Sequence, residues 1–307
     1  MNRFAKFAWG IVGIAVLDIL WGAFVRASKS GDGCGNHWPT CNGQVLPATE
    51  NIHTVIEYAH RGISGVLLLM VLALLIWGWR SYGKGNPIRV GVTCSAVFIL
   101  TEAGLGAGLV LLKLVGEDTS VLRAIVTATH LLNTFILLAS LTLTAWWASG
   151  NQGFTLKNKG YFPVLLGIGL LGVCFIGMSG AITALGDTLF PAKSLADGLA
   201  QDNDPNAHFL IQLRVYHPII AVLVGAYTLS LVGHIRSKLS GTSRKLSLLL
   251  GALVITQLSI GVLNLILLAP IAMQIIHLFM ADSVWISYVI LTASVLGIEK
   301  QAMEEIA

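Results

Sequence analysis

Four histidines of this sequence stand inside long apolar stretches, where ionisable side chains are rare. His60, His130, His217 and His277 each come roughly six to nine residues after the start of such a stretch, about 9 to 13 Å along a helix. Neutral imidazoles at one depth in an apolar environment are destabilising unless something binds them. Imidazole nitrogens are common metal ligands, so this pattern predicts ligands held at one level.

The elements that position these histidines are expected to be membrane-spanning helices. Hydrophobic residues make up 55% of the sequence and charged residues 11%, against about 25% charged residues in soluble domains. Eight apolar stretches are long enough for the roughly 20 residues that cross a bilayer. They cover residues 7–25, 54–79, 88–112, 121–147, 161–183, 208–233, 246–268 and 270–296. We therefore expect an all-α membrane protein with eight transmembrane helices, the first retained and not cleaved as a signal peptide.

The distribution of basic residues predicts the orientation in the membrane. Most of the 19 Lys and Arg residues, such as Arg3, Lys84 and Arg236, fall in the terminal segments and alternate loops of one side. Both termini are therefore expected in the cytoplasm, and the long loops 28–53 and 184–207 outside. The four histidines then lie toward the outer face, and this asymmetry explains the net charge of +4 without a nucleic-acid partner.

The chain also repeats itself once along its length. The matching segments are GAFVRASKSGDG with GAITALGDTLFP, EYAHRGISGVL with RVYHPIIAVLV, TEAGLGAGLVLL with TQLSIGVLNLILL, and ATHLLN with IIHLFM. Each half holds two of the four histidines, on helices that run in the same direction. We expect two tandem four-helix bundles related by pseudo-two-fold symmetry along the membrane normal, with residues 1–150 as the N-terminal domain and 151–307 as the C-terminal domain.

Two imidazoles on parallel helices at matched height can approach one plane from opposite sides. This is the arrangement that a bis-histidine haem requires in the core of a helical bundle. A lone histidine in a membrane is more often a helix contact or a proton relay, but four that recur pairwise favour ligands. We expect His60 and His130 to form one pair, and His217 and His277 the other.

The surroundings of the two pairs differ in charge. Glu57 stands one helical turn before the first histidine of the N-terminal half, where the repeat has Arg214. Glu102 corresponds in the same way to Gln257. A carboxylate beside a haem edge can stabilise a developing cation or pass protons, although spacing alone equally allows a salt bridge with an arginine. The asymmetry favours a reacting haem in the first half and a resident haem in the second.

Three arginines near the outer face are suited to bidentate contacts with haem propionates. Arg214 is expected to serve the haem of the C-terminal half, and Arg26 and Arg61 that of the N-terminal half. Arg26 and Arg61 are also the residues that could pair with Glu57.

Cys34 and Cys41 lie in the first outer loop, with Pro39 between them. A disulfide is plausible there because the outer side is oxidising. The sequence favours a structural link for the loop and leaves open a redox-active pair. Cys94 and Cys174 stand singly within helices and are assigned no chemistry.

At the level of whole motifs, the sequence resembles the haem A synthase family. GAFVRASKSGDGCGNHWPTC, the following GQVLP and IEYAHRGISG match the signature of that family, and the resemblance extends along the chain. It implies an enzyme that oxidises the C8 methyl group of haem O to a formyl group, giving haem A for cytochrome oxidase.

The resemblance also implies roles for individual residues. His60 and His130 would hold the substrate haem O, Glu57 would take part in the oxidation, and His217 and His277 would ligate a haem b that transfers electrons. The pair Cys34 and Cys41 corresponds to the first-loop cysteines of the family. A second pair, present in some members, is missing because the loop GDTLFPAKSLADGLAQDNDPNAHFL holds no cysteine, so a mechanism that needs both disulfides does not extend to this chain.

The expected partners follow from the same reading. They are haem O, membrane lipid, an electron donor that no motif identifies, and a haem O synthase that supplies the substrate. The expected location is a bacterial plasma membrane. Gly104 and Gly108 form a small-residue face that could pack helices within the chain or between copies in a homo-oligomer.

Three other functions are weighed against this one. A non-catalytic dihaem electron carrier, linked to quinol, explains the histidines but not Glu57. A haem O synthase, which is a prenyl transferase, needs paired aspartate-rich motifs that no cytoplasmic loop carries. A transporter fits poorly, because the repeats share one orientation and the ionisable residues gather toward one face.

The oxygen source is a further open point. A haem with two protein ligands offers no free position to dioxygen, so either one histidine dissociates or the periphery loses electrons and water attacks. The position of Glu57 slightly favours the water route.

Overall fold

The computed structural model describes residues 1–48 and 50–297, which are helical almost throughout. The helices are α1 (Arg3–Ala27), α2 (Ile52–Ser81), α3 (Pro87–Leu111), α4 (Val121–Ala148), α5 (Phe162–Leu189), α6 (Leu195–Asp202), α7 (Phe209–Arg214), α8 (Tyr216–Ile235), α9 (Gly241–Ile266) and α10 (Ile271–Leu296). Eight spans, with α7 and α8 together forming one of them, are long and apolar enough to cross a membrane. The expected all-α membrane fold with eight such helices is therefore confirmed.

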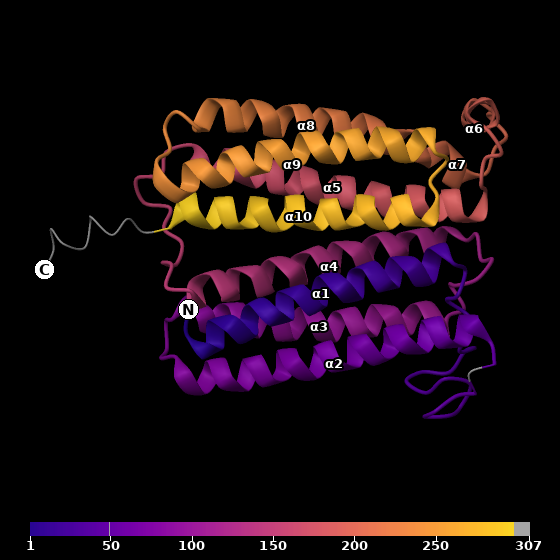
Figure 1. The fold of residues 1–307 in the computed structure, drawn as a ribbon, viewed down its shortest axis with the longest axis horizontal. Coiled ribbons are helices and arrows are strands. Elements are labelled where there is room, and N and C mark those ends of the chain that lie inside the picture. Colours follow the sequence, from indigo (N-terminus) through magenta and orange to yellow (C-terminus); the bar gives the residue numbers. More distant parts are fainter. Residues whose placement is uncertain (49, 298–307) are drawn as a thin grey trace, which may run out of the picture.

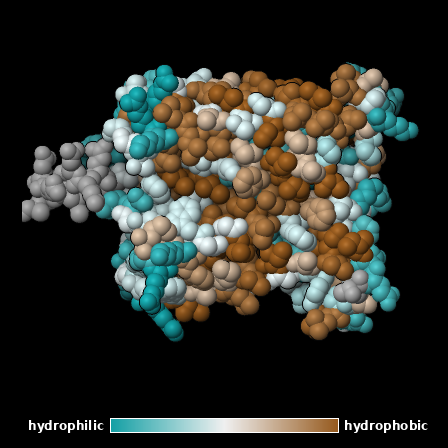
Figure 2. Space-filling model, in the orientation of Figure 1, coloured by the Kyte–Doolittle hydropathy of each residue, from teal (hydrophilic) through white to brown (hydrophobic). Residues whose placement is uncertain are grey.

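The surface agrees with this assignment. A broad hydrophobic band covers the middle of the molecule, and hydrophilic side chains gather at both ends of the helices (Figure 2). Apolar side chains on this band, such as Leu69, Leu171 and Leu223, are between 63% and 68% exposed. Exposed leucines in a continuous belt are expected where lipid is the solvent.

The helices form two groups that lie side by side (Figure 1). Helices α1 to α4 pack on one another, and α8 and α10 each pack against both α5 and α9. Contacts of α4 and α1 with α5 and α10 join the groups. This grouping follows the boundaries of the sequence repeat, while the pseudo-two-fold relation and the division into domains remain predictions.

The junction between the groups is a packed apolar core. Phe135 of α4 stacks on Trp285 of α10 with ring centroids 5.2 Å apart, and the indole Nε1 of Trp285 donates a hydrogen bond of 2.7 Å to the carbonyl oxygen of Phe135. Gly177 of α5 makes room for the Phe135 ring, since a Cβ there would lie 2.7 Å from it. The two groups are thus held together by close packing as well as by their linker.

Capping residues mark where the first four helices begin. Asn2, Asn51, Asn86 and Ser120 precede α1, α2, α3 and α4, and each side chain accepts a hydrogen bond from a backbone N–H of the first turn. Such caps satisfy donors that have no partner within the helix. Because these ends are fixed, the register of the histidines along α2 and α4 is fixed as well.

Two details differ from the sequence-based expectation in the second half. Helix α5 continues to Leu189, past the expected end at residue 183, and the short α6 lies within the expected outer loop 184–207. The sixth span is interrupted, because α7 ends at Arg214 and α8 begins at Tyr216. Pro218 accounts for the interruption, since its ring clashes with the carbonyl group four residues earlier, which belongs to Arg214.

Candidate functional site

Each histidine of the N-terminal half lies against a glycine of the preceding helix. A Cβ placed on Gly22 of α1 would lie 3.1 Å from Cε1 of His60 on α2. At Gly106 of α3 the corresponding distance to Cε1 of His130 on α4 is 4.0 Å. The imidazole rings therefore occupy space that any larger residue would narrow.

The C-terminal half repeats this arrangement. A Cβ on Gly180 of α5 would lie 3.0 Å from Cε1 of His217, and one on Gly261 of α9 would lie 3.1 Å from Cε1 of His277. Gly22 and Gly180 are the first residues of the matching motifs GAFVRA and GAITAL. The close approach of the imidazole rings explains why each motif begins with glycine. Sequence reasoning missed this role.

The two C-terminal rings face each other across a short gap. The ring centroids of His217 and His277 are 6.4 Å apart, and the ring planes are nearly perpendicular at 88°. Two imidazole nitrogens, each about 2 Å from one metal atom, place ring centroids about 6 Å apart. The pair therefore has the separation that a shared metal ion requires.

The donor set of both halves fits haem better than a bare metal ion. Within the described residues, no group of three or more His, Cys, Asp and Glu side chains is placed to hold a metal. Haem brings four ring nitrogens of its own and needs only one or two protein ligands. Buried Nδ1 atoms of His60, His130 and His277 make no aligned hydrogen bond, although a carboxylate lies near the first two of them.

Carboxylates accompany both histidines of the N-terminal half. Oδ1 of Asp18 on α1 lies 3.0 Å from Nδ1 of His60, and Oε1 of Glu102 on α3 lies 3.4 Å from Nδ1 of His130. Sequence reasoning noted Glu102 but missed Asp18. Its signal was available, because Asp18 is the one acidic residue within the first apolar stretch.

The same two carboxylates line an enclosed cavity between the four N-terminal helices. Its volume is about 20 Å³, and Thr134 and several apolar side chains complete its wall. A space of this size can hold one water molecule between polar partners. Asp18 and Glu102 thus face a common interior.

Glu57 is buried and both of its carboxylate oxygens have partners. Oε2 accepts a hydrogen bond of 2.7 Å from the backbone N–H of Cys34, and Oε1 pairs with the guanidinium of Arg61 at 2.5 Å. Arg61 also donates to the backbone carbonyls of His37 and Thr40 at 2.6 Å. The salt bridge that the sequence left open is therefore present, and it ties α2 to the first outer loop.

The first outer loop is closed by a disulfide between Cys34 and Cys41. Both cysteines are fully buried, and Thr54 of α2 donates a hydrogen bond of 2.7 Å to the carbonyl oxygen of Gly33. The predicted disulfide is confirmed, and the loop is anchored on the start of α2. A redox role for this pair remains a prediction.

The other two arginines serve the C-terminal half. Arg26 of α1 crosses to α5 and α10, where it donates to the carbonyl of Ala184 at 2.6 Å, to Thr188 at 2.7 Å and to Gln274 at 3.0 Å. The sequence assigned Arg26 to the haem of the N-terminal half, but its guanidinium binds residues of the C-terminal half. Arg26 is one of the polar links between the two groups of helices.

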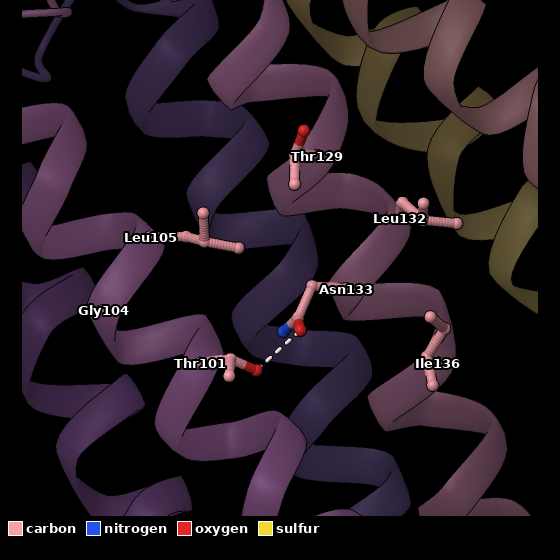
Figure 3. A pocket seen from close by; sticks show the side chains of 7 residues that line it. All are labelled: Thr101, Gly104, Leu105, Thr129, Leu132, Asn133 and Ile136. Atoms are coloured by element: carbon pink, nitrogen blue, oxygen red, sulfur yellow. Dashed lines mark hydrogen bonds between the residues drawn. The ribbon is translucent and has the colours of Figure 1, made fainter.

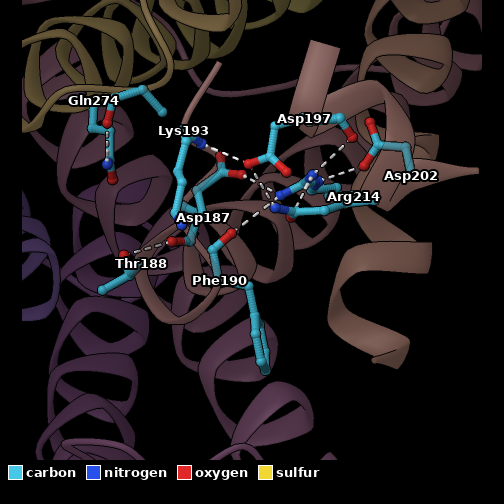
Figure 4. Close-up of polar contacts among 12 residues, drawn as sticks. Asp187, Thr188, Phe190, Lys193, Asp197, Asp202, Arg214 and Gln274 are labelled. Atoms are coloured by element: carbon cyan, nitrogen blue, oxygen red, sulfur yellow. Dashed lines mark hydrogen bonds and ion pairs between the residues drawn. The ribbon is translucent and has the colours of Figure 1, made fainter. Parts of the chain in front are cut away.

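Arg214 lies at the end of α7 within a polar cluster (Figure 4). Its Nε donates to Asp202 of α6 at 2.6 Å, and Nη1 lies 3.5 Å from Asp187 of α5. These contacts hold the short α6 over the end of α5. The guanidinium of Arg214 is therefore paired with two aspartates. The propionate contact that the sequence suggested for Arg214 remains a prediction.

A wide groove opens on the outside of α3 and α4 (Figure 3). It has a volume of about 570 Å³, and its lining is almost wholly apolar, with Gly104 and Leu105 on one wall and Leu132 and Ile136 on the other. Asn133 lines it too, and its Nδ2 donates to Glu102 at 2.5 Å. The side chain of Asn133 therefore lies between the groove and Glu102, the acid beside His130.

The described residues form an all-α membrane protein with eight spans, in which His217 and His277 of the C-terminal half lie close together. The family model described as cytochrome oxidase assembly protein, COX15-CtaA, matches residues 5–289. The chain belongs to this family.

Individual relatives fall under two names. A protein of Thermus thermophilus named protoheme IX farnesyltransferase is 47% identical over 298 residues, covering 96% of this chain and 49% of the relative. The heme A synthase of Halalkalibacterium halodurans is 34% identical over 173 residues, or 55% of each chain. The heme A synthase of Exiguobacterium sibiricum is 27% identical over 230 residues, covering 75% of this chain and 74% of the relative. The chain spans about half the length of the Thermus relatives that it matches.

Proposed function

We propose that this protein oxidises the C8 methyl group of haem O to a formyl group and so produces haem A for cytochrome oxidase. The observation that carries the proposal is the asymmetry between the histidine pairs. Carboxylates stand beside His60 and His130, whereas Ser179 and Gln257 stand beside their counterparts. Two haems used only for electron transfer would give no reason for this difference.

In this proposal His60 and His130 hold the substrate haem O. The glycines opposite them leave room for the rings, and α1 to α4 surround the pair. His217 and His277 hold a haem b, which supplies one-electron transfer when bound. The family membership and the relatives named heme A synthase support this division.

The reaction removes four electrons and two hydrogens from the methyl carbon and adds one oxygen atom. With water as the oxygen source, the methyl group and one water molecule give the formyl group, four protons and four electrons. The electrons pass to an acceptor of the respiratory or quinone class. With dioxygen as the oxygen source, the reaction needs an electron donor instead of that electron acceptor.

Glu57 is the residue placed to act on charge that develops during this oxidation. Its carboxylate is buried one turn from His60 on the same face of α2, and Arg61 and the Cys34 amide fix its orientation. A fixed carboxylate stabilises positive charge that develops nearby without having to reorganise. The loop between the two cysteines is fastened to this end of α2 through Arg61.

The substrate has to come from a reaction that attaches a farnesyl group to protohaem. The Thermus relatives carry the name of such a farnesyltransferase. We therefore expect this protein to work beside a haem O synthase in a bacterial plasma membrane, with its termini in the cytoplasm and its haem sites toward the outer face.

Haem extraction from purified protein tests the proposal. The protein is expressed together with a haem O synthase, and its haems are separated by chromatography. We expect haem b together with haem O and haem A, and we expect haem A to be lost in His130→Ala. A preparation that yields haem b alone, from both halves, would identify a dihaem electron carrier instead.

Isotope labelling tests the oxygen source. Single turnovers are run in labelled water or under labelled dioxygen, with exchange of the aldehyde oxygen measured in parallel. Label from water supports the route that uses Glu57, and label from dioxygen alone rules that route out.

A further inference from the structure

The two histidine pairs differ most in the charge that faces the imidazole ring. In the N-terminal half, Asp18 lies 3.0 Å from Nδ1 of His60 and Glu102 lies 3.4 Å from Nδ1 of His130. Each acid comes from the helix that precedes its histidine along the chain. The same relation therefore occurs twice within one bundle.

Neighbouring side chains hold both acids in place. The hydroxyl of Ser64 lies 2.9 Å and 3.0 Å from the two carboxylate oxygens of Asp18 and donates to that carboxylate. Glu102 accepts hydrogen bonds from Asn133 and Thr134 of α4. These hydrogen bonds hold each carboxylate in place beside its ring. Hydrogen bonds to an ionised carboxylate are stronger than those between neutral groups.

Neutral groups stand beside the rings in the C-terminal half, and of these only Ser179 faces an Nδ1 atom. The hydroxyl of Ser179 lies 3.0 Å from Nδ1 of His217, and the amide of Gln257 lies 3.4 Å from Nε2 of His277. Asp282 also lies on α10, but neither of its oxygens has a hydrogen-bond partner within the described part of the chain. No carboxylate among the described residues therefore pairs with a C-terminal histidine.

The chemical consequence concerns electron donation to iron. A histidine that binds iron through Nε2 keeps its proton on Nδ1, which then points to the group that faces it. A carboxylate in that position raises the basicity of the ligand more than a hydroxyl or an amide does. A more basic ligand stabilises ferric iron and so lowers the reduction potential of the haem.

We propose that Asp18 and Glu102 are positioning residues that make His60 and His130 the more electron-donating ligand pair. The haem held there then has a lower reduction potential than the haem held by the C-terminal pair. Electrons removed during oxidation of the substrate haem pass toward the second haem. This inference rests on the proposed function, because it needs a haem in each half.

Matched substitutions in the two halves test the inference. The purified, detergent-solubilised protein is loaded with protohaem, and both midpoint potentials are measured by optical redox titration. His60→Ala, which removes an N-terminal ligand, assigns the signals to the two sites. Glu102→Gln removes the charge beside Nδ1 of His130, and Ser179→Asp adds a carboxylate at the residue that faces Nδ1 of His217.

We expect Glu102→Gln to raise the N-terminal potential alone and Ser179→Asp to lower the C-terminal potential alone. Asp18→Asn, which keeps an acceptor oxygen and removes the charge, should also raise the N-terminal potential. Asp282→Asn is the matched control, with the same change in a transmembrane helix but no contact with a histidine, and it should move neither potential.

The alternative is that the two acids only brace the helices. In that case Glu102→Gln lowers the yield of folded protein, and Ser179→Asp leaves the C-terminal potential unchanged, which would overturn the inference even if Glu102→Gln fails to fold. Wild-type protein whose N-terminal histidines bind no haem would overturn the proposed function itself. Haem in both halves with equal potentials would overturn only the present inference.

Discussion

At the scale of single residues, the site depends on glycines, which lack a side chain, as much as on the histidines beside them. Four histidines lie next to glycines of neighbouring helices, and at Gly22, Gly180 and Gly261 the absence of a Cβ allows the close approach. In a close-packed interior even one added methyl group forces its neighbours to move. The glycines should therefore be as sensitive to substitution as the histidines.

Gly180→Ala should displace His217 and loosen the C-terminal site. The added methyl would lie 3.0 Å from Cε1 of the ring, and overpacking of this kind costs about 1 to 3 kcal/mol. We expect a lower haem b content, measured by the pyridine haemochrome assay, and a lower thermal unfolding temperature. Gly167→Ala on the same helix meets nothing within 4 Å and serves as the control. Equal haem content in both variants would contradict the prediction.

Glu57→Ala should separate binding from chemistry. The four histidines are untouched, so bound haem should be retained, while conversion of haem O should fall at least tenfold because the charge beside the haem edge is gone. The breaking of the buried pair with Arg61 should also lower stability by about 3 to 5 kcal/mol. Arg61→Ala is the matched variant, which breaks the same pair but keeps the carboxylate. Normal conversion by Glu57→Ala would remove this residue from the mechanism.

At the scale of elements, irregular segments decide where the polar groups go. The first outer loop is fastened to α2 by the disulfide, by Glu57 and Arg61, and by Thr54. In the second half, the interruption at Pro218 leaves Arg214 at a helix end, where it pairs with Asp187 and Asp202. Both bundles thus carry ion pairs at this end of the helices, although the residues differ.

Loss of the disulfide should loosen the first outer loop. Cys34 and Cys41 are separated by 7 residues in the sequence, and closing a loop of this length stabilises a fold by about 2 to 3 kcal/mol. Cys34→Ala together with Cys41→Ala should therefore lower the thermal unfolding temperature and increase cleavage of the loop by a protease. Cys94→Ala together with Cys174→Ala removes two free thiols and should leave loop cleavage unchanged. Equal cleavage in the two double variants would argue against an anchoring role.

At the scale of the whole molecule, two groups of four membrane-spanning helices share an apolar junction (Figure 1). Arg26 and the Phe135 and Trp285 pair cross this junction. If each half binds a haem as proposed, this close-packed junction keeps the two sites at a constant separation for electron transfer.

The orientation in the membrane gives a prediction at this scale. Lys157 lies in the segment between the bundles and Lys193 in the second outer loop, so the distribution of basic residues places them on opposite sides. In intact cells, a membrane-impermeant thiol reagent should label Lys193→Cys and not Lys157→Cys, in a background without Cys94 and Cys174. Labelling in broken cells checks that both sites are reactive. The reverse pattern in intact cells would invert the topology.

The eight spans and the level of the histidines could be predicted from the sequence. Apolar length and the ends of the apolar stretches determine where helices cross a bilayer, and the register of His60 or His277 follows from its distance to a helix start. The disulfide was also accessible, because its cysteines are close in sequence and lie in one loop. These features depend on local sequence and on the bilayer alone.

Only the tertiary structure decided which groups from different helices meet. Asp18 and His60 are distant in sequence but lie 3.0 Å apart, and Arg26 binds α5 and α10 instead of its own bundle. Such contacts depend on how helices rotate about their axes and on which small residues let them approach. Composition and periodicity do not specify that rotation, whereas packing of side chains against glycines such as Gly22 and Gly180 does.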